Sequence, residues 1–199
     1  MLLQEETPLV IWRIRYCAPP AALRYCKKCK KKSEFICSGE FRINAQQKEL
    51  DIRLIYKCAR CNATWNSTIF SRVSPQKLEA GLLERFLCND KDLAMRYAMD
   101  LALLQRNGAE IKLPAFQVMG EEVPLERASR IKIESQYALP LKTASVLRAK
   151  LGVSQREFDA LLRNNRIIST TGQDLKKCKL SSEETIVVIL AETDLRWGH

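Results

Sequence analysis

The chain has 199 residues, of which 46% are hydrophobic and 28% are charged, a composition that predicts a globular protein with a substantial buried core. Its sequence contains no apolar run of about 18 residues and no signal-peptide pattern, which predicts a cytoplasmic protein without membrane contact. The formal net charge of +10 at pH 7 favours a polyanionic partner.

The first regular element that the sequence predicts is a strand over residues 10–16. Val10, Trp12, Ile14 and Tyr16 fall on one face of an extended segment, because side chains alternate across a strand. The proline pair at residues 19–20 ends this strand.

Two C-x-x-C pairs, Cys26 with Cys29 and Cys58 with Cys61, are the most informative motif. Each pair forms a short turn that points two sulfurs at one place, and two turns supply the four tetrahedral ligands that Zn²⁺ prefers. A closed set of four thiolates leaves no position for water or substrate, so the predicted role of the zinc is structural. The alternative is two separate thiol pairs, oxidised or redox-active.

The segments around the two pairs predict a zinc ribbon, that is, two metal-binding turns joined by strands. Residues 34–37, 40–43, 50–56 and 64–70 are rich in β-forming side chains, and residues 50–56 alternate apolar with polar. Lys30 stands where such turns often have glycine, a residue that accepts positive φ without strain. The equivalent position in the second turn is Asn62, and asparagine also tolerates positive φ. The four remaining cysteines are interpreted as packed thiols. The alternative is that Cys17 or Cys37 lies near the metal as an additional ligand. The four residues are Cys17, Cys37, Cys88 and Cys178.

The first turn carries a dense run of positive charge. Such a run repels itself, and binding to a polyanion relieves the repulsion and releases counterions. The alternative is a solvated loop without a partner. Three nearby aromatic residues, Tyr25, Tyr56 and Trp65, can stack on bases, but covering a small core is the preferred interpretation. The predicted RNA-binding lysines of this turn are Lys27, Lys28, Lys30, Lys31 and Lys32.

Residues 25–72 resemble a bacterial family known as domain of unknown function 1062. The likeness lies in residues 25–29, 35–44, 50–58 and 61–66, which include both cysteine pairs. This resemblance implies a bacterial protein with paired cysteines, and it implies no activity.

The middle of the chain predicts a helical hairpin. Ser74 and Pro75 are typical of a helix start, and the pattern continues to residue 87. A second helix is predicted to begin at Asn89 or Asp90 and to end at Gly108. Residues 114–124 are predicted as a loop, and residues 131–137 as a strand.

The C-terminal part predicts two helices followed by two strands. The first helix covers residues 141–151, and Ser154 with Glu157 forms a capping box that opens the second, with Phe158, Leu161 and Leu162 as core. Residues 167–168 and 185–190 are predicted as strands. This order resembles the alpha-L RNA-binding fold of the ribosomal protein S-four type, although Asn165 replaces a usual glycine; a generic helical hairpin with a β-ribbon is the alternative. The resemblance and the local charge give the RNA-binding candidates Arg156, Arg163, Arg166, Lys176, Lys177 and Lys179.

These elements predict an α+β protein with three segments: a β-rich zinc ribbon over residues 1–74, a helical middle over 75–129 and an alpha-L-like domain over 130–199. In chain order, the first segment holds 14 basic and 6 acidic residues, the second 7 and 9, and the third 12 and 8. Their formal net charges are therefore +8, −2 and +4. Two basic ends around an acidic middle indicate two contact surfaces for a polyanion.

Catalysis is not predicted, because the only histidine is the terminal residue, His199, and no phosphate-binding loop or nucleophile motif is present. Two binding functions remain. The favoured one is a non-enzymatic, ribosome-associated zinc protein that binds structured RNA, ribosomal or transfer. The alternative is a zinc-ribbon adaptor that binds a protein partner or regulates transcription.

Overall fold

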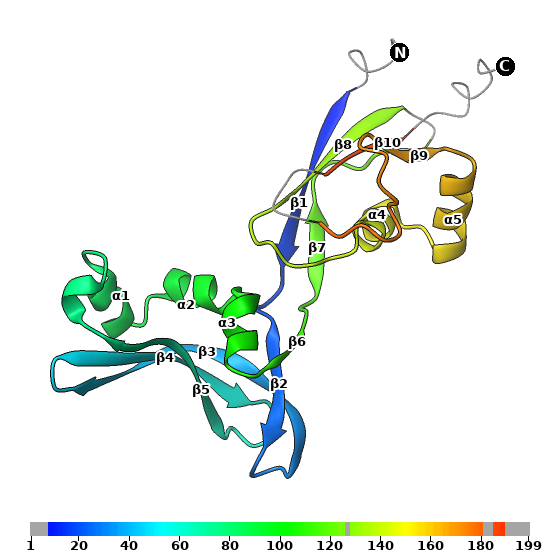
Figure 1. Ribbon diagram of the computed structural model, residues 1–199. Coiled ribbons are helices and arrows are strands. Elements are labelled where there is room, and N and C mark those ends of the chain that lie inside the picture. Colours follow the sequence, from blue (N-terminus) through cyan, green and yellow to red (C-terminus); the bar gives the residue numbers. More distant parts are fainter. Residues whose placement is uncertain (1–7, 126–127, 181–184, 190–199) are drawn as a thin grey trace. The chain divides into compact units, whose positions relative to one another are not determined.

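A computed structural model describes residues 8–125, 128–180 and 185–189. Within them the protein is a mixed α and β structure in which strands dominate over helices, as Figure 1 shows. The backbone divides into two compact units, one formed by Cys17–Ala115 and the other by Met1–Tyr16 together with Phe116–His199. We name them the cysteine unit and the terminal unit and describe each by itself.

The cysteine unit is built on a five-stranded antiparallel sheet with the order β5-β4-β3-β2-β6. The two longest pairings join β3 to β4 and β4 to β5, so three consecutive strands form a meander. Its strands are β2 (Ala21–Cys26), β3 (Lys31–Gln46), β4 (Glu49–Cys58), β5 (Thr64–Val73) and β6 (Glu110–Lys112).

Strand β3 is one long strand, whereas the sequence predicted two short ones around Ser38 and Gly39. The register with β4 shifts between Cys37 and Phe41, which marks a bulge in β3. Gly39 adopts a φ of 76° there, and the Ser38 hydroxyl donates to the Ile55 carbonyl across the pair at 2.9 Å. A bulge bends a strand without ending it, so the pairing of β3 with β4 resumes at Phe41 after the turn-like residues.

The helices of this unit cover one face of the sheet (Figure 1). They are the 3₁₀ turn η1 (Pro75–Lys77), α1 (Leu82–Leu87), α2 (Lys91–Ala98) and α3 (Leu101–Arg106). The two longer helices predicted from the sequence are each divided. Gly81, at a φ of 76°, separates η1 from α1, and Asp100, whose side chain accepts from the Leu103 amide at 2.9 Å, starts α3 anew.

The covered face holds the core of this unit. Along β4 the side chains at even positions from Leu50 to Cys58 are buried, which is the alternation that the sequence predicted. Phe86 of α1 lies against this face, with its ring 4.8 Å from that of Phe41 and 5.7 Å from that of Tyr97. The opposite face has no helix of its own unit over it.

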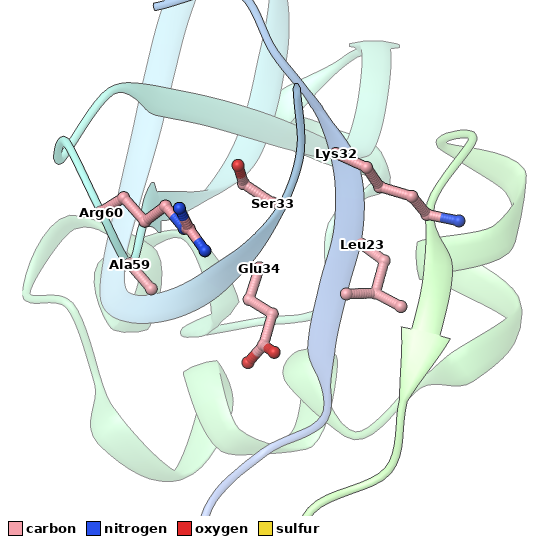
Figure 2. Close-up of a pocket in the computed structure, with 6 residues that line it drawn as sticks. All are labelled: Leu23, Lys32, Ser33, Glu34, Ala59 and Arg60. Carbon is pink, nitrogen blue, oxygen red and sulfur yellow. The ribbon is translucent and has the colours of Figure 1, made fainter. Parts of the chain in front are cut away.

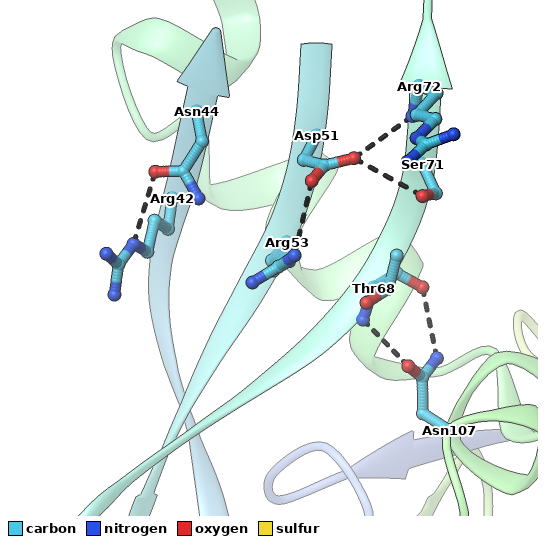
Figure 3. Close-up of polar contacts among 8 residues, drawn as sticks. All are labelled: Arg42, Asn44, Asp51, Arg53, Thr68, Ser71, Arg72 and Asn107. Atoms are coloured by element: carbon cyan, nitrogen blue, oxygen red, sulfur yellow. Dashed lines mark hydrogen bonds and ion pairs between the residues drawn. The ribbon is translucent and has the colours of Figure 1, made fainter. Parts of the chain in front are cut away.

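Polar contacts fix β5 to its neighbours (Figure 3). The Asp51 carboxylate of β4 accepts from the Arg72 amide at 3.0 Å and from the Ser71 hydroxyl at 3.3 Å. The Arg72 amide is the main cause that lowers the pKa of Asp51. On the outer edge of β5, the Asn107 side chain accepts from the Thr68 amide at 2.9 Å and donates to the Thr68 carbonyl at 3.0 Å, as a neighbouring strand would.

The terminal unit has a second five-stranded sheet with the order β7-β1-β8-β10-β9, in which only the described pair β1 with β8 is parallel. The predicted strand over residues 10–16 is confirmed, but residues 114–124, predicted as a loop, contain β7. The strands are β1 (Leu9–Tyr16), β7 (Phe116–Met119), β8 (Ser129–Ser135), β9 (Ile167–Ser169) and β10 (Thr185–Ile189).

Two helices, α4 (Thr143–Leu151) and α5 (Gln155–Arg163), pack in this unit. The capping box is confirmed, because the Ser154 hydroxyl accepts from the Glu157 amide at 3.3 Å and the Glu157 carboxylate accepts from the Ser154 amide at 2.7 Å. Phe158 is fully buried, whereas Leu161 and Leu162, predicted as core, are only half-buried. The expected central hairpin and alpha-L-like arrangement as such stay predictions.

The two units do not follow the three segments expected from the sequence. The reason is that β1, near the N-terminus, pairs with β7 and β8, which lie 100 residues or more later, for example Trp12 with Ile133. No helix in the described part of the chain is both long and apolar enough to cross a membrane.

Candidate metal centre

Two turns at one end of the sheet carry the four predicted metal ligands. Cys26 ends β2 and Cys29 lies in the turn before β3, while Cys58 ends β4 and Cys61 lies in the turn before β5. The Lys30 φ is 53° and the Asn62 φ is 57°. Both turns therefore use a left-handed backbone at this position, the conformation for which such turns often have glycine. Asn62 also donates its amide to the Cys58 carbonyl at 2.9 Å, which closes the second turn.

The four sulfurs form one compact group. All of them lie within 4.8 Å of one another, with 3.5 Å between Cys26 and Cys61 and 3.9 Å between Cys29 and Cys58. Four thiolates around one Zn²⁺ at about 2.3 Å would lie about 3.8 Å apart in a regular tetrahedron. The observed spacings bracket this value, so the residues present fit a four-thiolate metal ion.

The group is held against the hydrophobic core of the cysteine unit. Cys26 is 1% exposed and Cys58 is fully buried, whereas Cys29 and Cys61 are half-buried. The Trp65 ring lies beside the group, 5.2 Å from the ring of Tyr56, and the Arg24 guanidinium lies 4.5 Å from its centroid. The ligands are therefore fixed by packing on one side and open to solvent on the other.

The electrostatics of the group divide the protons unequally between the thiols. Backbone amides of Arg60 and Cys61 point at the Cys58 sulfur and lower the pKa of that thiol to about 6. The neighbouring sulfur of Cys61 is the main cause that raises the pKa of Cys29 to about 12. The thiolate form is therefore favoured at Cys58 and disfavoured at Cys29, and metal binding must release the protons that remain on the sulfurs.

The other four cysteines take no part in the group. Cys17 and Cys88 are exposed, and Cys37 and Cys178 are half-buried. Burial raises the pKa of the Cys37 thiol, which makes it a packed group of low reactivity. All eight cysteines are free thiols, so neither pair forms a disulfide.

The predicted RNA-binding lysines lie around the first turn, and all five are exposed. Lys32 forms an ion pair with Glu110 at 2.5 Å. The other four, Lys27, Lys28, Lys30 and Lys31, form no ion pair within the described residues.

The predicted RNA-binding residues of the terminal unit do not all lie at the surface. Arg166 is 9% exposed and donates to the Leu125 carbonyl at 2.5 Å, so its guanidinium is used inside the protein. Lys176 pairs with Asp159 at 2.8 Å, and Lys177 with Asp174 at 3.8 Å. Of these candidates, Arg156, Arg163 and Lys179 are exposed and form no ion pair in the described chain.

Two residues beside the metal centre were not predicted from the sequence as site residues. Arg60 lies within the second cysteine pair and is exposed, and the basic residues between both pairs were its only signal. Tyr25 is 64% exposed, whereas Tyr56 is fully buried and Trp65 half-buried. The preferred interpretation of these aromatics as core is therefore right for Tyr56 and wrong for Tyr25.

Comparisons with known proteins identify a family. A family model described as "Protein of unknown function (DUF1062)" matches residues 43–173, which are 131 of the 199 residues and include the second cysteine pair. No curated protein and no solved structure matches the chain, so the resemblance of its C-terminal part to the alpha-L fold stays a prediction. Because the model covers more than half of its length, the chain belongs to the DUF1062 family.

Proposed function

We propose that the four cysteines bind one Zn²⁺ ion in a structural role. Four thiol donors without histidine or carboxylate favour a soft or borderline cation, and zinc is the usual occupant of such a set. All four positions would be filled by the protein, so the ion would hold the two turns together and leave no place for a substrate. The sulfur spacings of 3.5 and 3.9 Å support this assignment.

We infer that the protein binds structured RNA, ribosomal or transfer RNA, through the turns that the zinc holds. One observation carries this inference: Lys27, Lys28, Lys30, Lys31 and Arg60 surround the metal centre, and none has an ion-pair partner within the described residues. Unpaired cations on fixed turns attract phosphate groups and release their counterions on binding.

A competing explanation is that these cations only balance the charge of the metal centre. Four thiolates with one Zn²⁺ carry a net charge of −2, and nearby lysines would reduce the repulsion among the sulfurs. Two cations suffice for that balance, whereas the turns carry five without other partners. The surplus of three positive charges supports an external anionic partner.

The terminal unit offers a second surface for the same partner. Arg156 and Arg163 lie seven residues apart on α5, about two helical turns, so they share one side of the helix, and both are exposed. Phe158 points into the core from another side. We propose that this side of α5 contacts RNA, with Arg166 excluded by its burial.

The salt dependence of RNA binding tests the inference. Changing Lys27, Lys28 and Lys31 to Gln removes three cations, so the log–log slope of affinity against salt should become shallower by about 2–3 while zinc content is unchanged. The matched control changes three exposed lysines that lie outside the two cysteine turns in the sequence to Gln, and it should leave the slope unaltered. These lysines are Lys48, Lys77 and Lys91. No RNA binding by the wild type, or equal slopes for the two triple variants, would exclude the proposed function.

A further inference from the structure

A pocket of about 580 Å³ opens beside the metal centre (Figure 2). Its volume lies within the about 300–1,000 Å³ that is common for sites of small ligands. Two neighbouring strands and the second cysteine turn form its wall. The lining residues are Leu23, Lys32, Ser33, Glu34, Ala59 and Arg60.

The floor of the pocket belongs to the helix-free face of the sheet. Leu23 of β2 is the register partner of Glu34 on β3, and Tyr25 is the partner of Lys32. Residues two apart on a strand share a face, so these four side chains form one patch, while Ala22 and Cys26 turn into the core. Tyr25, which is 64% exposed, therefore stands beside the pocket with its ring available to a ligand.

The charges of the pocket leave one cation free. Lys32 is paired with Glu110 at 2.5 Å, and Glu34 with Lys112 at 2.5 Å. Arg60 has no ion-pair partner in the described chain, and Figure 2 shows its guanidinium extending from the second cysteine turn toward Ser33 and Glu34 of β3. A planar guanidinium with an unused fork of donors suits a phosphate, which it can bind through two parallel hydrogen bonds.

We propose that this pocket and Tyr25 together bind one unpaired nucleotide of an RNA, an inference that rests on the proposed function and adds the part of the RNA that is recognised. Arg60 takes the phosphate, and the base lies on Leu23 and the Tyr25 ring. The Glu34 carboxylate, with one oxygen on Lys112, keeps the other for an N–H group of the base. Bases within a duplex cannot reach such a patch, because they are stacked and paired, whereas bases in loops and bulges can.

Lysines around the first turn would then guide the rest of the strand. The four unpaired lysines lie two to six residues after Tyr25 in the chain, so the phosphates on either side of the bound nucleotide would meet them. An acidic peptide would also satisfy these cations, but it would leave the exposed ring without a flat partner. Stacking on an aromatic ring is the common way in which proteins hold single strands.

The test compares a short single-stranded RNA with the same strand annealed to its complement, bound to the full-length zinc-loaded protein at one salt concentration. Tyr25→Leu and Arg60→Gln should each weaken binding of the single strand about tenfold, the order expected for one stacked base or one phosphate contact. The duplex offers no base to the pocket, so Tyr25→Leu should weaken its binding at most about twofold, and Arg60→Gln should weaken it less than it weakens binding of the single strand. Tyr25→Phe keeps the ring and should bind the single strand as the wild type does.

Matched controls come from the same unit. Leu87 is an exposed apolar residue on α1, and Arg106 is an exposed cation at the end of α3. Leu87→Ala and Arg106→Gln should leave both affinities unchanged. Because Tyr25 and Arg60 are exposed, their variants should keep the wild-type melting temperature and zinc content, which shows that a loss of affinity is not a loss of folding.

Several outcomes would overturn the proposal. If the lysine variants weaken RNA binding but Tyr25→Leu and Arg60→Gln do not, the pocket is not used and the proposed function stands. Equal losses for single strand and duplex would show that Arg60 is only part of a general positive field. Competition by poly-glutamate as strong as that by RNA would assign the surface to an acidic protein, and a wild type that binds no RNA would end both proposals.

Discussion

Replacing Cys58 with serine tests the metal centre where it is most deeply embedded. The Cys58 side chain is fully buried, and its sulfur lies 3.9 Å from that of Cys29. Structural zinc sites contribute apparent free energies of about 10–16 kcal/mol, against a net stability of about 5–15 kcal/mol for a domain. Losing only a third of the zinc contribution, about 3–5 kcal/mol, would therefore remove much of the stability of the cysteine unit.

Tryptophan fluorescence can follow each unit separately during urea unfolding. Trp65 lies in the cysteine unit, 5.2 Å from the Tyr56 ring, and Trp12 is fully buried in the terminal unit. Changing Trp12 and Trp197 to Phe leaves Trp65 as the only tryptophan. In that background Cys58→Ser should abolish zinc binding and lower the unfolding midpoint. In a background that keeps only Trp12, the same substitution should leave the midpoint unchanged.

Cys88→Ser is the matched control, because Cys88 is exposed and lies outside the group of four sulfurs. It should keep the zinc and the wild-type midpoint. A chelator should lower the midpoint of the wild type and of Cys88→Ser to that of Cys58→Ser, since all three would then lack the ion. Metal-free protein from a zinc-rich preparation, or equal midpoints for the two serine variants before chelation, would refute the assignment of these cysteines to a metal.

Two further predictions concern the terminal unit. Gly120 has a φ of 126°, and a Cβ there would lie 2.4 Å from the Ile11 carbonyl oxygen, so Gly120→Ala should cost at least about 3 kcal/mol by Trp12 fluorescence. Gly152→Ala, at a φ of 67° with no atom within 4 Å of the new Cβ, should cost only about 1–2 kcal/mol, and equal costs would contradict this reasoning. Ser154→Ala should cost about 1 kcal/mol by removing the helix cap. The Ser154 amide lowers the pKa of Glu157 below its unfolded value, so this carboxylate stabilises the fold at neutral pH and the contribution is lost as pH falls through the folded pKa; Glu157→Gln should flatten that acid limb, and an unchanged limb would count against the cap.

The features that the sequence predicted well are those set by neighbours in the chain. The capping box needs only Ser154 and Glu157, three residues apart, and both of its hydrogen bonds are present. The cysteine pairs are similarly local, because a C-x-x-C turn fixes the direction of its own two sulfurs. The sequence spacing was enough to predict that the two turns meet at one place, which the sulfur distances confirm.

The features that it predicted poorly depend on distant partners. The alternation in residues 10–16 shows which side chains of β1 are buried, but not that β1 pairs with β7 and β8. For the same reason, Arg166 was predicted as a surface cation, whereas its guanidinium donates to the Leu125 carbonyl inside the protein. A charge run indicates positive surface only where the fold provides no internal acceptor.

The backbone conformation of the first cysteine turn supports a functional role for its positive charge. Lys30 adopts a φ of 53°, a backbone conformation that costs an ordinary side chain about 1–2 kcal/mol relative to glycine. Its side chain is exposed and forms no ion pair in the part of the chain that the structure describes, so packing does not offset this cost. Asn62 meets the same requirement in the second turn with a residue that tolerates it. A lysine in place of glycine breaks a local rule without structural compensation, and such departures are expected at functional sites. An exposed positive charge on this backbone is what the proposed binding of an anion by the turn predicts.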